Sequence, residues 1–170
     1  MNLADRAVSG LSPPGFACYT SPMSQTIAEM RAFLQETADE LNDLMSMDVM
    51  EMYRQLTELG NSLPDLPSAD RTPANFVHGC TSNVYIGARF EGGRVLYAGS
   101  SEAHIVRGYV AVLVNALSGL TPAEIINETE GPITAFAEGT NIRATLTPSR
   151  ANAFGNIYKL MLAKAHEIAG

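Results

Sequence analysis

The residue with the clearest chemical potential is Cys80, which lies in a short segment that reads as a turn. Residues 75–85 (NFVHGCTSNVY) bring an apolar stretch into Gly79, and small polar residues follow the cysteine. Glycine allows a sharp backbone bend, and Thr81, Ser82 and the loop amides can donate hydrogen bonds toward sulfur. Such donors favour the thiolate, which is the reactive form of cysteine. The segment therefore predicts a nucleophilic thiol at the tip of a turn.

Two other interpretations of Cys80 remain open on these residues alone. Free cysteine often serves as a small buried hydrophobe, so core packing is one alternative. A thiol hydrolase or peroxidase is the other, and it would need a base and an oriented third group beside the thiol. His78 is the one candidate base nearby, since it could take a proton or supply positive charge; a structural or exposed histidine fits its position better than a base does.

The second cysteine, Cys18, adds no further chemistry. It is far from Cys80 in sequence, so the two make neither a disulfide framework nor a metal-ligand cluster. A scaffold that binds zinc or an iron–sulfur cluster would need three or four ligands, which one loop cysteine cannot supply unless two chains share a site. We expect no metal and no cofactor.

Composition and charge narrow the class of protein further. The chain has 170 residues, of which 46% are hydrophobic and 17% charged, so it can bury a substantial core. Its net charge of −7 argues against nucleic acid as a partner, because phosphate binding needs clustered cations. We see no long apolar run that would span a membrane and no secretory signal. These features predict a cytoplasmic, reducing-compartment protein.

The first half of the chain predicts two helices and a hairpin. Residues 1–23 read as an irregular leader before a single domain over residues 24–170. A helix begins at Thr26, and Glu29 completes a capping box. A second helix covers residues 49–59 with Gly60 as its C-terminal cap, and a proline-containing linker follows at residues 63–67. Strands over residues 83–90 and 94–98 are joined by a Gly-Gly turn.

The second half predicts further helices. Residues 100–114 are the most apolar stretch, and a serine N-cap with Glu102 in the first turn marks the start of a central buried helix. The β-branched residues of this stretch would also allow a strand. Thr121 opens a capping box, and Thr147 before Pro148 opens the last helix in the same way. The fold class is thus α+β, a small antiparallel sheet with helices packed around it. The methionines near the second helix are expected in the core, namely Met45, Met47, Met50 and Met52.

Five ordered segments resemble the SufE family of sulfur-acceptor proteins, which includes CsdE. They are residues 53–66 with their Leu-Pro linker, residues 71–84 with the cysteine loop, residues 103–108, residues 121–125 and residues 146–152. The likeness runs from about residue 48 to the C-terminus. The chain departs from the family at Tyr85, where tryptophan is usual, and at Ser100 and Glu102, where an aspartate pair is usual.

The resemblance implies a function for Cys80. Family members take a persulfide sulfur from a pyridoxal-phosphate cysteine desulfurase, speed that enzyme, and pass the sulfur to an iron–sulfur cluster scaffold. They act as stoichiometric carriers and need no metal or cofactor of their own. Carried across residue by residue, Cys80 is the acceptor, while Arg150 and Glu102 match positions that support the loop or the partner.

Two expectations concern the free protein. We expect Cys80 to be partly sheltered, because an exposed persulfide is readily reduced or oxidised. We expect a monomer or a weak homodimer, with no nucleic acid and no membrane among its partners.

Overall fold

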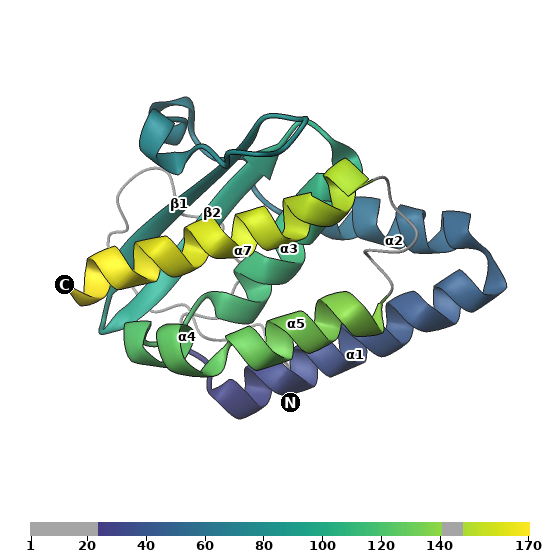
Figure 1. The fold of residues 1–170 in the computed structure, drawn as a ribbon, viewed down its shortest axis with the longest axis horizontal. Coiled ribbons are helices and arrows are strands. Elements are labelled where there is room, and N and C mark those ends of the chain that lie inside the picture. Colours follow the sequence, from purple (N-terminus) through teal and green to yellow (C-terminus); the bar gives the residue numbers. More distant parts are fainter. Residues whose placement is uncertain (1–23, 141–147) are drawn as a thin grey trace, which may run out of the picture.

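The fold is α+β, as predicted, and a computed structural model describes it over residues 24–140 and 148–170, with side chains described for residues 24–140 and 152–170. A two-stranded antiparallel sheet is packed against helices within this part of the chain (Figure 1). The expected leader at residues 1–23 and Cys18 within it lie outside the described residues.

The first two helices begin where the sequence predicts them, the first of them at its capping box. Helix α1 (Ile27–Met47) follows Thr26, whose hydroxyl accepts a hydrogen bond from the Glu29 amide while the Glu29 carboxylate accepts one from the Thr26 amide. The predicted capping box is confirmed. Helix α2 (Val49–Ser62) starts immediately afterwards, with Asp48 as its N-cap.

The strands form the predicted hairpin with one difference in length. Strand β1 (Val84–Glu91) pairs with β2 (Arg94–Ser101), and the register runs from Val84 opposite Ser101 to Glu91 opposite Arg94. Gly92 and Gly93 have φ of 58° and 77°, which suits a two-residue turn. Strand β2 continues to Ser101 instead of ending at residue 98, so the serines expected at a helix start are strand residues.

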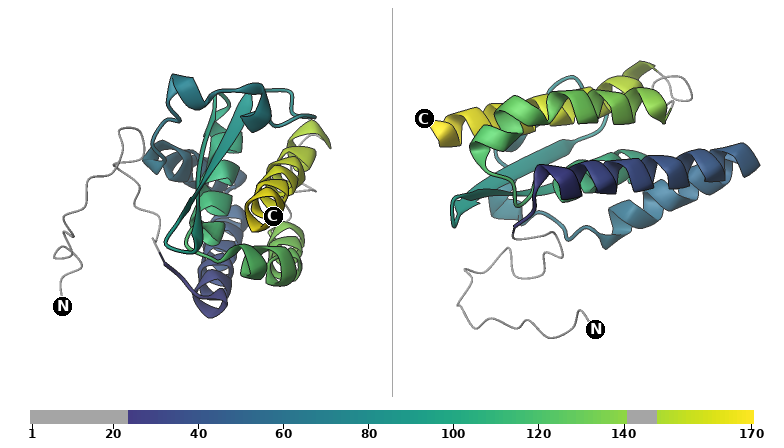
Figure 2. Two further views of the ribbon diagram at one scale, coloured as in Figure 1. Left: turned by 90° about the vertical axis from the view of Figure 1, so that its left-hand side faces the viewer. Right: turned by 90° about the horizontal axis from the view of Figure 1, so that it is seen from below.

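Helix α3 (His104–Leu117) is the predicted central buried helix. It contacts β2, α1, α2 and α7, and it lies between the sheet and the outer helices (Figures 1 and 2). Its expected start was wrong: the N-cap is Ala103, without a side-chain cap, and Glu102 precedes the helix. Among the described residues no single helix is long and apolar enough to cross a membrane; one bent pair, α3 with α4 (Pro122–Glu128), passes on length and composition only.

The backbones of α2 and α3 touch at two glycines, and this corrects the expected end of α2. The helix continues through Gly60 to Ser62, so Gly60 is not its cap. A Cβ on Gly60 would lie 2.9 Å from the Gly108 amide nitrogen, and one on Gly108 would lie 2.3 Å from the Leu56 carbonyl oxygen. The glycine at position 60 is therefore required by a helix crossing and not by the end of a helix.

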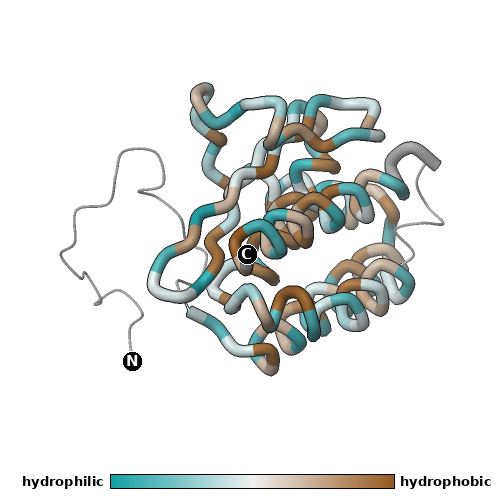
Figure 3. Tube along the Cα trace, turned by 60° about the vertical axis from the view of Figure 1, so that its left-hand side comes forward, coloured by the Kyte–Doolittle hydropathy of each residue, from teal (hydrophilic) through white to brown (hydrophobic). Residues whose placement is uncertain are grey.

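The remaining helices close the other side of the molecule. Thr121 caps α4 with the predicted capping box. Helix α5 (Glu130–Gly139) then lies beside α1, and α7 (Pro148–Ala169) is the predicted last helix, whose expected cap Thr147 lies outside the described residues. Hydrophobic and hydrophilic colours alternate along these outer helices in Figure 3, as expected for elements with one buried face.

The methionine cluster is only partly in the core. Met52 is 1% exposed, whereas Met47 and Met50 are 78% and 63% exposed. Both exposed residues lie at the corner where α1 ends and α2 begins around Asp48. The expectation of core packing was therefore wrong for Met47 and Met50, because the corner carries them away from the helix interface.

Substituting Gly108 by alanine tests the helix crossing. The added methyl group meets the backbone of Leu56, which cannot rotate away, so we expect a loss of about 1–3 kcal/mol in the free energy of unfolding. Gly155→Ala in α7 is the matched control, since no atom lies within 4 Å of its added Cβ. Urea denaturation should show this control unchanged or stabilised; equal midpoints for Gly108→Ala and the parent chain would contradict the crossing.

Candidate functional site

Cys80 lies in a loop of residues 78–83 whose two ends are fixed by a stem. The Val77 amide donates a hydrogen bond to the Val84 carbonyl at 2.9 Å, and Phe76 and Tyr85 form an antiparallel bridge beside it. Val77 and Val84 are buried. The stem thus joins the Cys80 loop firmly to the start of β1.

The turn before the cysteine rests on α7. Gly79 has φ of 84°, which confirms the predicted bend at glycine. A Cβ there would lie 2.8 Å from Nδ2 of Asn156 and 3.9 Å from its Oδ1, so the amide nitrogen faces the turn. Asn156 also forms a side-chain hydrogen bond with Cys80. The thiol site is therefore built by two segments, the loop and α7.

Cys80 is half-buried against the hydrophobic core, in agreement with the expected shelter. Burial raises the pKa of its thiol above the ordinary 9.0, and the hydrogen bond from Asn156 lowers it by a smaller amount. Among the described residues neither Thr81 nor Ser82 acts on this pKa. The expectation that loop donors favour the thiolate was wrong: the donor comes from α7, and in the resting protein burial outweighs it.

Of the other predicted site residues, the structure describes the side chains of Glu102 and His78 but not that of Arg150. Glu102 is exposed in the turn between β2 and α3, and Arg150 lies in the first turn of α7 with its side chain outside the described part. His78 is exposed, and its ring lies edge-on to Phe76 with centroids 5.1 Å apart. Within the described residues no base contacts the thiol, and no group of His, Cys, Asp and Glu side chains could hold a metal ion.

Helix α7 also holds the segment that precedes the loop. The Lys164 ammonium donates to Asn75 Oδ1 at 2.6 Å and to the Ala74 carbonyl at 3.3 Å, and the Asn75 amide donates to the Asp70 carbonyl. Burial lowers the pKa of Lys164, partly offset by Glu167. Lys164 and Asn156 therefore fix the cysteine segment at two places along one helix.

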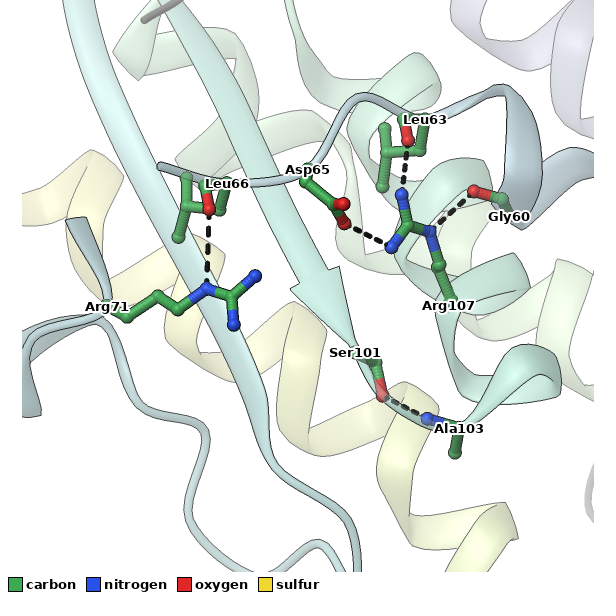
Figure 4. Close-up of polar contacts among 8 residues, drawn as sticks. All are labelled: Gly60, Leu63, Asp65, Leu66, Arg71, Ser101, Ala103 and Arg107. Atoms are coloured by element: carbon green, nitrogen blue, oxygen red, sulfur yellow. Dashed lines mark hydrogen bonds and ion pairs between the residues drawn. The ribbon is translucent and has the colours of Figure 1, made fainter. Parts of the chain in front are cut away.

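The linker is held by the Arg107 clasp, in which one guanidinium bonds Gly60, Leu63 and Asp65 (Figure 4). Arg107 donates to the Gly60 carbonyl at 2.8 Å, to the Leu63 carbonyl at 2.5 Å and to the Asp65 carboxylate at 2.5 Å. Arg107 lowers the pKa of Asp65, and a hydrogen bond from Ser100 adds to this. The clasp ties the end of α2 and the linker to α3.

A cavity of about 280 Å³ lies beside the stem. Its lining consists of Arg71, Pro73, Phe76, His78 and Tyr85. Tyr85, the residue expected to replace a family tryptophan, lies edge-on to Phe76 with ring centroids 5.4 Å apart. A larger cavity of about 660 Å³ lies between α1 and α5, and no residue of the Cys80 loop lines it.

Comparison with known families agrees with this site. Residues 35–165 match the family described as "SufE: Fe-S metabolism associated domain", a stretch that includes the Cys80 loop, Asn156 and the Arg107 clasp. The chain belongs to the SufE family. The resemblance inferred from five sequence segments is thereby confirmed.

Individual relatives agree with the family match. The chain is similar to a SufE-like protein of Synechocystis sp., 45% identical over 69% of this chain and 72% of that one. It is also similar to the sulfur acceptor protein CsdE of Escherichia coli, 34% identical over 69% of this chain and 79% of that one. A hypothetical protein from Thermus thermophilus shares the fold, with a TM-score of 0.62 at 20% identity over 79% of this chain and 94% of that one.

Three residues that build this SufE-type site were not identified as such from the sequence. Asn156 and Lys164 are polar residues on a helix, and such residues usually face solvent. Arg107 reads in the sequence only as an interruption of an apolar stretch. A signal existed for Arg107, because a lone cation inside so apolar a helix requires partners; none existed for the other two.

The Arg107 clasp predicts unequal roles for its two kinds of partner. Arg107→Ala leaves two backbone carbonyls without their donor and should lower the free energy of unfolding by about 1–3 kcal/mol. Asp65→Asn should lower it by less than about 1 kcal/mol, because the Asp65 side chain is 68% exposed. Urea denaturation of both variants measures the two losses, and an equal loss in each would contradict this ranking.

The ion pair between Arg107 and Asp65 also makes the free energy of unfolding depend on pH. The folded-state pKa of Asp65 is depressed, so its contribution is complete above the ordinary pKa of 3.8 and is lost as pH falls through the lower folded value. Urea denaturation at neutral pH and below 3.8 should show the gap between the parent chain and Asp65→Asn shrinking in acid. A gap that is constant or grows in acid would contradict the ion pair.

Alanine at Gly79 should change the cysteine site, whereas alanine at Gly93 should not. Both positions have positive φ, so both variants carry similar backbone strain of about 1–2 kcal/mol. Only at Gly79 does the added methyl group meet Asn156 Nδ2 and displace it from Cys80; nothing lies within 4 Å at Gly93. Alkylation of Cys80 by iodoacetamide should therefore change in Gly79→Ala alone, and equal rates in both variants would refute the contact.

Proposed function

We propose that this protein is a sulfur acceptor for a pyridoxal-phosphate cysteine desulfurase, with Cys80 as the residue that receives the sulfur. The observation that carries the proposal is the position of Cys80, the cysteine that the sequence resemblance assigns as the acceptor and that lies within the stretch matching the SufE family. It lies in a loop fixed at both ends and half-open to solvent. The sulfur-acceptor name of the CsdE relative supports the same role.

The proposed reaction is an exchange between a persulfide and a thiolate. The Cys80 thiolate attacks the outer sulfur of the desulfurase persulfide, a new S–S bond forms to Cys80, and the old S–S bond breaks. Written out, Enz–S–SH and Cys80–S⁻ become Enz–S⁻ and Cys80–S–SH, with no net oxidation. The rate of such a step depends on thiolate fraction, nucleophilicity and access.

The structure offers less support for the alternatives. A thiol hydrolase or peroxidase needs a base at the sulfur, and His78 faces solvent and the Phe76 ring instead. A persulfide transfer needs no such base in this protein once the thiolate has formed, because the leaving group is a thiolate of the partner.

The later steps of the pathway form part of the proposal. We propose that Cys80 passes its sulfur to an iron–sulfur cluster scaffold in the cytoplasm, and that the carrier works as a monomer or a weak homodimer. Glu102, exposed beside the start of α3, and Arg150, in the first turn of α7, are proposed to support the loop or the partner.

Intact-mass analysis tests the proposed function. The protein is incubated with a purified cysteine desulfurase and free cysteine, and we expect a gain of one sulfur atom that a reductant reverses. Cys80→Ser is the control and should gain none, and cysteine turnover by the desulfurase should rise only with the parent chain. Absence of the gain with an active desulfurase from the same organism would overturn the proposal.

A further inference from the structure

The contact between Asn156 and Cys80 has a chemical consequence beyond packing, and the inference drawn from it rests on the proposed function. Asn156 reaches the thiol from α7, a different element from the loop that carries the cysteine. Its amide nitrogen, not its oxygen, faces the turn, with Nδ2 2.8 Å and Oδ1 3.9 Å from the position of a Cβ on Gly79. The orientation makes Asn156 a donor toward sulfur.

We propose that Asn156 is a catalytic hydrogen-bond donor to Cys80 Sγ, which stabilises the thiolate both when it attacks and when it leaves. During loading, the donor stabilises the charge on Sγ before the new S–S bond forms. During discharge, an acceptor thiolate takes the outer sulfur: Cys80–S–SH and R–S⁻ become Cys80–S⁻ and R–S–SH. The charge then returns to Sγ, where Asn156 donates.

The hydrogen bond from Asn156 stabilises the Cys80 persulfide less than it stabilises the Cys80 thiolate. In a persulfide the ionised group is the outer sulfur, one bond farther from Asn156, so the hydrogen bond is weaker for the charge of that state. A thiol leaves faster when its anion is better stabilised. Asn156 therefore favours release of the sulfur over its retention, as a carrier requires.

Ionisable side chains of the surrounding elements do not offer an alternative way to stabilise the Cys80 thiolate. In the loop, His78 faces solvent and Phe76. On the described part of α7, Lys159 is exposed and Lys164 is bound to Asn75. Beside α3, Glu102 and His104 are exposed, and within the described residues none of these five side chains acts on the Cys80 pKa.

The first test measures the pH profile of Cys80 alkylation by iodoacetamide and needs no desulfurase. Asn156→Leu keeps the bulk that shelters the thiol but removes the donor, and Asn156→Asp replaces the donor by an acceptor of the same shape. Both should slow alkylation at pH 8 by about three- to tenfold, because the thiolate fraction falls tenfold for each pKa unit, whereas the rate at high pH, where the thiol is fully ionised, should not fall.

Asn127→Leu is the matched control, since Asn127 is a helical asparagine that donates to the Ala123 carbonyl in α4, away from the thiol. Its profile should equal that of the parent chain. Circular dichroism and thermal midpoints verify that each variant is folded, and Asn156→Asp decides the outcome if the leucine variant does not fold. Unchanged or faster alkylation in a folded Asn156→Asp would overturn the donor role.

The second test measures discharge of the persulfide. Each variant is loaded by a cysteine desulfurase, separated from it, and mixed with dithiothreitol, and loss of the extra sulfur is followed by intact mass. We expect Asn156→Leu to discharge more slowly than Asn127→Leu, and equal rates would overturn the leaving-group role. If the parent chain is never loaded but the alkylation profiles differ as expected, the proposed function fails while the donor role stands.

Discussion

The contact of two helix backbones at Gly60 and Gly108 sets the arrangement of everything around it. Because no side chain separates α2 from α3 there, α3 can lie at the centre with its apolar residues buried on nearly every side. The same approach brings the end of α2 within reach of Arg107, which holds the linker in turn. The crossing and the Arg107 clasp therefore fix the start of the segment that leads to the Cys80 loop.

Two features of its surroundings act in opposite directions on the pKa of the Cys80 thiol, namely burial and a hydrogen bond. Contact with the core protects Cys80 and raises its pKa, which makes the resting thiol less reactive. The hydrogen bond from Asn156 on α7 lowers this pKa without exposing the sulfur. For the proposed function this balance is favourable, because a thiol with a raised pKa is less readily oxidised and the Asn156 hydrogen bond still helps it to ionise.

Local signals predicted those parts of the fold that local interactions decide. The capping boxes at Thr26 and Thr121, the turn at Gly92 and Gly93, and the apolar central helix could all be predicted from the sequence. The wrong prediction at Gly60 concerns a position where a distant segment decides: Gly60 has the sequence context of a cap, and only the packing of α3 against it shows otherwise. Cys80 was recognisable from the residues of its own loop. Its hydrogen-bond donor Asn156 lies far along the chain, and no sequence pattern around it indicated a contact with the cysteine.

The stem that closes the Cys80 loop also limits how far the sulfur can travel. Val77 and Val84 are buried, and the Val77 amide donates a hydrogen bond to the Val84 carbonyl, so both are fixed points at the two ends of the loop. Cys80 is three residues from Val77, and a fully extended chain spans at most about 3.5 Å per residue. The Cα atom of Cys80 therefore lies within about 10 Å of that of Val77 in any conformation of the loop. Under the proposed function, a partner must therefore bring its own sulfur close to the stem.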